Sequence, residues 1–391
     1  MRTSILRFAS LAALTVVAIV AACGEDEVGT VRVRPDGGAS DGGDAGEQEK
    51  LACGVVVPTT YASTNLAANA KEELELKDRF EQLSAKMKSA EGTNNTVVTA
   101  GELRAIYETG TPSLKSISTS AAQALVDGYF TAFGDASQKV WTADLPDSEA
   151  GAPNGGKYEG QSYMSATGVD LREATEHVLL GGAFFNHALV LASGPVTEAT
   201  VDRLLVSFGA TPKLANSTAD DAGEDVDELI AEYASKRDDK SQMIGSYRRI
   251  GKALIRMRAA AGAGEKCNED LRVALNLYFT EWERVTLASA IYYLNAAAAA
   301  GLASPPKGFT ALHAYGEALG FVASFKGVTQ DRRKITDLQI DDILSKIGAT
   351  TPYQLVTKPN DRAPRLVDGI NAIAVIYGFT PTEVDAFKKE F

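Results

Sequence analysis

Apolar residues recur at helical spacing along most of the chain. Leu271, Leu275, Tyr278 and Trp282 follow one another at steps of four and three, and they mark one face of a helix over 268–300. The same spacing predicts further helices at roughly 66–91, 99–109, 118–134, 168–193, 197–207, 222–237, 241–262, 308–325, 336–347, 361–377 and 381–390. Because alternating strand patterns are scarce, the sequence predicts an all-α fold.

Capping signals support several of these helix boundaries. Thr380 precedes Glu383 by three residues, and Thr336 precedes Gln339 by three, which is the spacing of a capping box. Asn268 precedes two acidic residues that suit the positive end of a helix dipole. Glycines stand where left-handed helix ends are expected, at Gly348 and Gly378.

Two of the predicted loops are long, polar and rich in glycine and aspartate. They cover Thr142–Tyr163 and Pro212–Gly223, and we expect both to be exposed excursions or lids rather than parts of the core. The folded region, 51–391, is long enough for one large domain or two modest ones.

The first 22 residues have the layout of a secretory signal peptide. Arginines precede Phe8–Val20, an almost wholly apolar run that is too short to cross a bilayer core of about 30 Å as a helix. Val20–Cys23 then resembles the lipobox of bacterial lipoproteins, in which the cysteine thiolate takes up a diacylglyceryl group. Cys23 is therefore the predicted lipidation site. A conventional signal peptide with an incidental cysteine is the alternative.

Residues 23–50 are predicted to form a disordered tether behind the lipid. Gly24–Lys50 is rich in Gly and Asp and contains no aromatic residue, so it has little to bury. A flexible coil of this length spans on the order of 30 Å. Acyl chains on Cys23 would anchor the protein to a membrane of the cell envelope. Glycine rather than aspartate follows Cys23, which favours the outer membrane over the inner membrane.

The charge of the chain limits its partners. The formal net charge is −12 at pH 7, which argues against binding to nucleic acid or to an anionic lipid surface. No P-loop motif and no lysine-rich patch of the kind that reads phosphate is evident, so the sequence predicts no phosphate site.

Three cysteines are present in all. With Cys23 lipidated, Cys53 and Cys267 remain, and an exported protein can join such a pair in an oxidising compartment. We predict a Cys53–Cys267 disulfide that stabilises the fold by about 2–4 kcal/mol. Two free thiols or a metal-binding pair are the alternatives.

Histidine and glutamate share a helix face at two positions. His313 and Glu317 are four residues apart, and Glu173, Glu176 and His177 open a helix whose continuation is almost entirely apolar. An apolar helix of this kind belongs in the centre of a bundle. If the two helices pack together, the five side chains form a ligand set suited to zinc or iron. Alternatively, each His–Glu pair is a local hydrogen-bonded pair that satisfies polar groups near a helix start.

Several motifs carry a resemblance to a known family. They are Ala122–Tyr129, Leu179–Phe185, Trp282-Glu283, Ala288–Asn295, His313–Ala318 and Lys334–Leu344. In this order they resemble a lipoprotein family known as a domain of unknown function (number 4856). That family is similar in turn to imelysin-like envelope proteins, helical bundle proteins linked to iron acquisition, some of which are classed as peptidases. The resemblance implies two packed imelysin-like sub-bundles, roughly 51–210 and 240–391.

Catalytic motifs are missing from the sequence. His-Glu-x-x-His and Gly-x-Ser-x-Gly do not occur, and three residues separate His313 from Glu317, where imelysins have Gly-x-His-x-x-Glu. These observations favour a non-catalytic envelope protein that binds a ligand, a metal or a partner protein. The resemblance implies a role in iron acquisition together with envelope uptake proteins. A metal-dependent peptidase of imelysin type is the alternative.

Overall fold

The computed structural model describes residues 48–93, 96–141, 155–214, 226–238 and 245–389. The predicted signal peptide, Cys23 and most of the tether lie outside the described residues, as do most of the two long loops. Residues 48–391 form one compact unit. Within the described residues no helix is both long enough and apolar enough to span a membrane.

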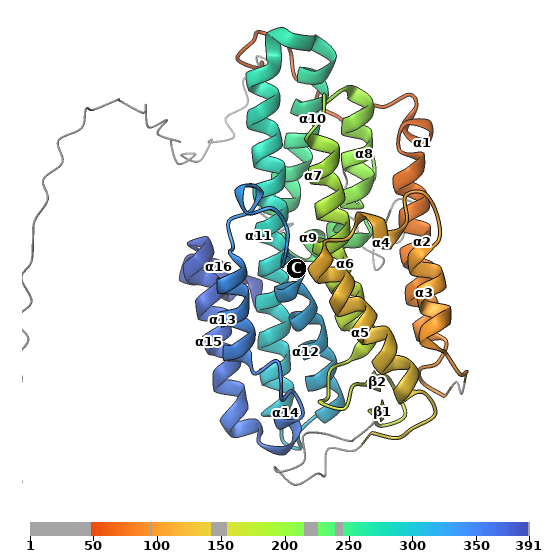
Figure 1. Cartoon of the computed structure of the whole chain (residues 1–391). Helices are drawn as coiled ribbons and strands as arrows, with labels where there is room; N and C mark the ends of the chain where they lie inside the picture. The colour runs from red at the N-terminus through yellow and green to blue at the C-terminus, as the bar shows by residue number, and fades with distance from the viewer. Residues whose placement is uncertain (1–47, 94–95, 142–154, 215–225, 239–244, 390–391) are drawn as a thin grey trace, which may run out of the picture. The chain divides into compact units, whose positions relative to one another are not determined.

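The predicted all-α fold is confirmed (Figure 1). The helices are α1 (Leu66–Asn69), α2 (Lys71–Lys88), α3 (Ala100–Glu108), α4 (Leu114–Ile117), α5 (Ser120–Ala136), α6 (Leu171–Leu179), α7 (Asn186–Ala192), α8 (Glu198–Phe208), α9 (Leu229–Arg237), α10 (Ser246–Ala263), α11 (Asn268–Gly301), α12 (Gly308–Ala323), α13 (Asp337–Ile347), α14 (Gln354–Thr357), α15 (Pro359–Tyr377) and α16 (Pro381–Phe387). Short η segments lie at Leu180–Phe185 (η1), Gly264–Cys267 (η2) and Gln330–Arg332 (η3).

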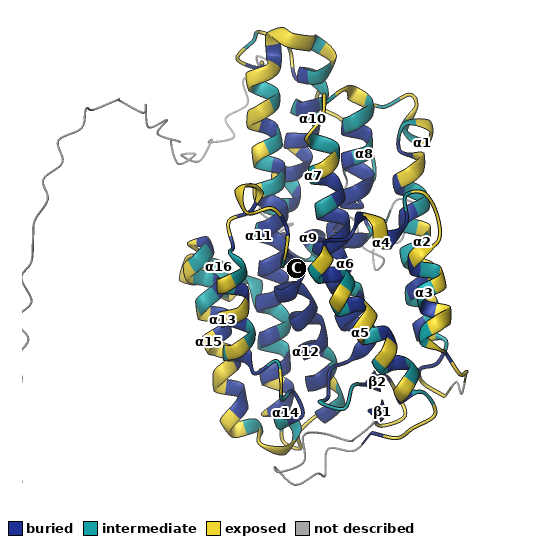
Figure 2. Cartoon of the chain, viewed as in Figure 1, coloured by how far each residue is buried: buried dark blue, intermediate teal, exposed yellow. Residues whose placement is uncertain are grey.

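The long helix α11 organises the bundle. It packs against α9, α10, α12, α15 and α16, and α12 in turn packs against α6 (Figure 1). Buried positions run along α11 and α12 (Figure 2). The main hydrophobic core takes side chains from both of the predicted sub-bundles. The contact between α6 and α12 joins the two halves of the sequence at the centre of this core.

Helix ends follow the local sequence. The capping boxes at Thr336 and Thr380 are present, and Gly348 and Gly378 adopt the left-handed conformation that ends α13 and α15. The predicted helix over 168–193 is interrupted by the π-helical segment η1 between α6 and α7. Periodicity alone did not distinguish this segment from an α-helix, because all six of its residues are buried.

The prediction that Thr142–Tyr163 is an exposed excursion is wrong for its described end. Gly156–Lys157 (β1) pairs antiparallel with Tyr163–Met164 (β2), and most of the strand residues are buried. Tyr158 packs edge-on against Trp141, with ring centroids 4.7 Å apart, and Tyr163 packs against Phe133. The aromatic side chains in this loop supply apolar surface that folds back onto the bundle.

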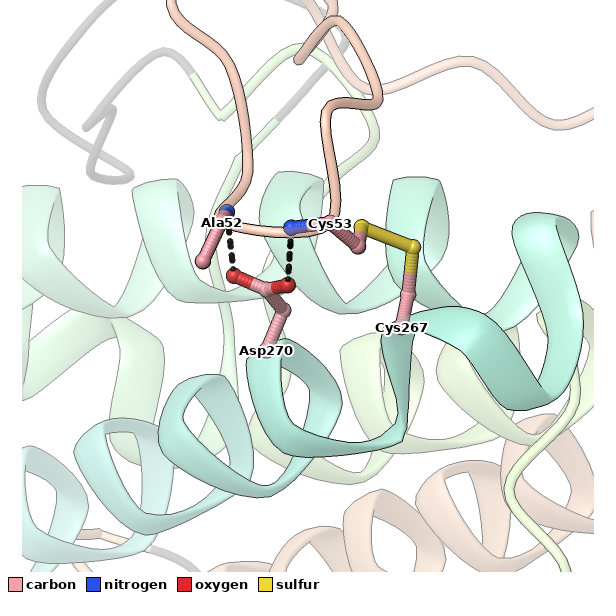
Figure 3. Close-up of a disulfide and its surroundings, with 4 residues drawn as sticks. All are labelled: Ala52, Cys53, Cys267 and Asp270. Atoms are coloured by element: carbon pink, nitrogen blue, oxygen red, sulfur yellow. Dashed lines mark hydrogen bonds between the residues drawn. A yellow bond between two sulfur atoms is a disulfide. The ribbon is translucent and has the colours of Figure 1, made fainter.

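The predicted disulfide joins Cys53 to Cys267, with the two Cα atoms 5.3 Å apart (Figure 3). Beside it, the carboxylate of Asp270 accepts hydrogen bonds from the backbone N–H groups of Ala52 and Cys53, at 2.8 and 3.0 Å. Asp270 lies in the first turn of α11, as expected from its sequence position. Ala52 and Cys53 are therefore fixed to the start of α11.

Candidate functional site

Two glycines let α6 and α12 approach closely. A Cβ atom at Gly316 would lie 2.8 Å from the Cβ of Asp170, and one at Gly320 would lie 2.5 Å from the Cβ of His177. Both distances are too short for non-bonded carbon atoms, so only glycine fits at these positions. His313 and Glu317 are on the same helix, and the close crossing brings them to the first turn of α6.

Asp170 both caps α6 and contacts His313. It is the N-cap residue of α6, and one of its carboxylate oxygens accepts a hydrogen bond from the backbone N–H of Glu173. The other oxygen lies 3.0 Å from Nδ1 of His313. Asp170 is fully buried. The cap of one helix therefore orients the imidazole of the other.

The second ring nitrogen of His313 faces two carboxylates. Nε2 lies 3.5 Å from Oε1 of Glu317 and 3.6 Å from Oε1 of Glu173. Atoms that bind one metal ion at about 2.0–2.2 Å are separated by roughly 3.0–3.5 Å in tetrahedral or octahedral geometry. We call Asp170, Glu173, His313 and Glu317 the His313 cluster.

The glutamates of this cluster are buried. Glu317 is 8% exposed, Glu173 is 5% exposed, and an oxygen of each lies within 4.8 Å of the other. Oε2 of Glu317 makes no hydrogen bond with any described residue. A buried carboxylate oxygen without a partner costs free energy unless a proton or a cation binds to it. The side chain of His313 is 30% exposed, so the cluster can be reached from solvent.

Arg172 is the cation next to the cluster. It forms ion pairs with Glu91, Glu173 and Glu176, and its guanidinium is largely buried. The pair with Glu91 ties α6 to the segment that follows α2. Arg172 therefore partly neutralises the group of acids at the start of α6, and it holds Glu176 away from the His313 cluster.

His177 belongs to the same buried region but its ring nitrogens are occupied. Nδ1 lies 2.6 Å from the backbone oxygen of Glu173, and Nε2 lies 2.8 Å from the hydroxyl of Tyr233 on α9. The ring also packs against Phe321, with centroids 4.4 Å apart. His177 lies within metal-ligand reach of Glu173 and Glu317, but it could bind an ion only by giving up one of these hydrogen bonds.

Burial sets the protonation of the cluster. Burial raises the pKa of Glu317 to about 7, although the charge of His313 and a hydrogen bond from Tyr293 act in the opposite direction. Burial also raises the pKa of Glu173 well above its usual range, against the effect of Arg172. Protons therefore compete with any cation for these two carboxylates near neutral pH.

The surroundings shift the pKa values of His177 and His313 in opposite directions. Burial lowers the pKa of His177 to about 3, so this ring is neutral. Burial also acts to lower the pKa of His313, but the hydrogen bond and the charge of Asp170 outweigh it and raise that pKa. The Asp170–His313 pair matches the arrangement in which a carboxylate fixes the tautomer of a metal-binding histidine.

Four of the five ligands predicted from the sequence lie in this region, in two groups that share Glu173: Asp170, Glu173 and His313 form one, and Glu173, His177 and Glu317 form the other. The fifth, Glu176, instead pairs with Arg172 at 3.1 Å. Sequence reasoning missed Asp170, although an aspartate three residues before Glu173 is a recognisable N-cap signal. It also missed Tyr233 and Tyr293, which approach from α9 and α11 and leave no local pattern.

Comparison with protein-family models, with curated proteins and with solved structures finds no match to this chain.

Proposed function

We propose that this chain is a non-catalytic lipoprotein of the cell envelope that binds a divalent transition metal, zinc or iron, at the His313 cluster. The observation that carries the proposal is the buried Oε2 of Glu317, which has no hydrogen bond with a described residue and belongs to a carboxylate beside His313. Imidazole and carboxylate together are ligands that suit both metals.

The roles of the four residues follow from their contacts. Nε2 of His313 and the carboxylates of Glu173 and Glu317 are the proposed direct ligands. Asp170 accepts the hydrogen bond from Nδ1 of His313 and so keeps Nε2 free for the metal. Two carboxylates neutralise the charge of a divalent ion, which is the condition for holding it in a largely buried site.

The proposed location depends on the N-terminal sequence. Lipid on Cys23 would anchor the protein, with the outer membrane favoured, and the tether would let the helical domain stand clear of the surface. The resemblance to imelysin-like proteins adds a role in iron acquisition beside envelope uptake proteins. Replacing Cys23 by serine should release the protein from the membrane fraction and abolish incorporation of labelled palmitate. Unchanged fractionation would contradict the anchor.

Metal content tests the proposed function. Protein purified without chelator, and then equilibrated with Zn²⁺ or Fe²⁺, should hold one ion per chain by elemental analysis and melt at a higher temperature than the chelated protein. Glu317→Gln should lose both effects. Glu281→Gln is the matched control, because Glu281 is as buried as Glu317 but lies away from the cluster. Tyr293 marks the part of α11 that contacts Glu317, and Glu281 is about 18 Å from it along the helix axis. Absence of metal and of any melting shift in the wild type would overturn the proposal.

A metal-dependent peptidase is the second candidate. Three protein ligands would leave coordination positions for water and substrate, as in catalytic zinc sites, and the exposed edge of His313 gives access. Hydrolysis of an unstructured peptide by the metal-loaded wild type, lost in His313→Ala, would favour this candidate. Metal binding without hydrolysis would exclude the peptidase and would leave metal binding as the proposed function.

A further inference from the structure

A cavity lies between α11, the end of α15 and the segment that joins α12 to α13. Its volume is about 340 Å³, which is within the usual range for small-molecule sites. Its lining includes Leu189 of α7, Phe279 and Glu283 of α11, Lys334 and Tyr377. None of the lining residues belongs to the His313 cluster.

Three of the four cationic side chains that line this cavity are already paired with acids of the protein. The pairs are Arg284 with Glu383, Arg332 with Asp331 and Arg333 with Asp337, at 3.2, 3.9 and 2.7 Å. Because each positive charge is balanced within its own pair, these three arginines leave no net charge for a ligand to neutralise.

Two opposite charges of the lining remain without an oppositely charged partner among the described residues, the ammonium of Lys334 and the carboxylate of Glu283. The ammonium lies over the ring of Tyr377, 5.8 Å from its centroid. The hydroxyl of Tyr377 donates a hydrogen bond to Glu283 at 2.5 Å. Tyr377 therefore contacts both charges, which lie too far apart to form an ion pair with each other.

The carboxylate of Glu283 can accept a further hydrogen bond. Its Oε1 accepts hydrogen bonds from Tyr377 and from the backbone N–H groups of Lys334 and Ile335. Its Oε2 accepts one from the backbone N–H of Lys334, at 2.8 Å. Since a carboxylate oxygen has about two acceptor sites, Oε2 has room for one more donor. Glu283 is 3% exposed, and a buried carboxylate binds a cationic donor more strongly than a neutral one.

We infer that this cavity binds a free α-amino acid with an apolar side chain. Such a ligand carries an ammonium and a carboxylate on the same carbon atom, so it can bridge the gap between Glu283 and Lys334. Its ammonium donates to Oε2 of Glu283, and its carboxylate pairs with the ammonium of Lys334. Phe279 and Leu189 supply the apolar wall for its side chain.

The sequence alone carries no signal for this site. Glu283 and Lys334 are 51 residues apart, and the helical period does not relate one to the other. Their meeting depends on the hydrogen bonds that join the backbone at 334–335 to α11.

Calorimetric titration of the full chain with L-leucine and with L-phenylalanine, in the presence of a chelator, tests the inference apart from the metal site. We expect at least one of the two to bind. Two leucine analogues test the two charges separately, because 4-methylpentanoate lacks the ammonium and 3-methylbutylamine lacks the carboxylate. Each should bind at least about tenfold more weakly than leucine. No binding of either amino acid, or an analogue that binds as tightly as leucine, would overturn the inference.

The variant Lys334→Gln tests the contact with the ligand carboxylate. Its affinity for the amino acid should fall by about tenfold or more, because a hydrogen bond between two charged groups is lost. Lys334 is exposed, so the substitution should preserve the fold. The matched control is Lys71→Gln, which removes the same charge from an exposed position on α2 and should leave the affinity unchanged. Equal affinities in the two variants would contradict the assigned role of Lys334 and the inference with it.

Discussion

His313 receives its orientation from a residue on another helix. Its Nδ1 lies 3.0 Å from the carboxylate of Asp170, which also caps α6. A partner of this kind fixes the ring and raises the basicity of the nitrogen that faces the metal. Asp170 is therefore as much a part of the proposed metal centre as the direct ligands are.

Replacing Asp170 by asparagine should weaken zinc binding. The loss of the charge and of one acceptor oxygen leaves His313 less well oriented, and outer partners of this kind contribute about 10–100-fold to metal affinity. Calorimetric titration with Zn²⁺ measures the change. Asp270→Asn is the control, because Asp270 also accepts backbone hydrogen bonds but lies beside the disulfide. Equal zinc affinity in Asp170→Asn and the wild type would contradict the assigned role.

Glu317 should make the metal-free protein less stable as the pH rises. Its pKa in the folded state is about 7, above the ordinary value of 4.5, so the folded protein holds this proton more tightly than the unfolded chain does. Its contribution is therefore favourable at low pH and is lost as the pH rises from about 4.5 to about 7. Glu317→Gln removes the titration and should be more stable than the wild type at pH 8, by up to about 3 kcal/mol.

Urea unfolding in the presence of a chelator, at pH 5 and at pH 8, measures this difference. The two proteins should differ little at pH 5, where Glu317 is mostly protonated. Adding Zn²⁺ at pH 8 should then stabilise the wild type more than the variant. If the free energy of unfolding changed with pH in the same way in the wild type and in Glu317→Gln, the raised pKa of Glu317 would be contradicted.

The sequence predicts those candidate ligands that lie on the same face of a single helix. His313 with Glu317, and Glu173 with His177, are four residues apart, which predicts a shared helix face. The meeting of the two pairs depends on tertiary packing, and so does the diversion of Glu176 to Arg172. Periodicity within one helix carries no information on which other helix it will touch.

The crossing of α6 and α12 is the element on which the proposed site depends. A methyl group at Gly320 would meet the Cβ of His177 at 2.5 Å and the backbone oxygen of Ala174 at 3.0 Å. His177 cannot move away easily, because both of its ring nitrogens are hydrogen-bonded. Gly320→Ala should therefore lower the free energy of unfolding by about 1–3 kcal/mol and weaken metal binding.

The matched control for this substitution is Gly128→Ala in α5. Gly128 is also inside a helix, but nothing lies within 4 Å of the position of its Cβ. Alanine there should raise the free energy of unfolding by about 0.5–1 kcal/mol through helix propensity alone. Chemical denaturation of both variants measures the contrast. A stabilised Gly320→Ala protein would show that α6 and α12 do not pack as closely as described.

Among the elements, helices with clear caps could be predicted and irregular segments could not. The ends of α13 and α16 follow from Thr336 and Thr380, whose side chains accept the expected backbone hydrogen bonds. The π-helical segment η1 and the small sheet at 156–164 have no comparable local signal. Their conformations are set by close packing, as at Gly182, where a Cβ would lie 2.5 Å from the Cβ of Ala122.

The Cys53–Cys267 disulfide closes a loop over a sequence separation of 214. Replacing both cysteines by serine should lower the free energy of unfolding by about 2–4 kcal/mol, because the unfolded chain gains freedom. Reducing agent should have the same effect on the wild type and none on the double variant. Mass spectrometry that finds both thiols free in the non-reduced mature protein would contradict the bond.

The His313 cluster is proposed to hold a metal ion between α6 and α12. Anomalous diffraction at the zinc edge, from crystals equilibrated with Zn²⁺, would locate this ion. We expect one peak at about 2.0–2.2 Å from Nε2 of His313 and from carboxylate oxygens of Glu173 and Glu317. Zinc-equilibrated crystals with no anomalous peak among these side chains would contradict it.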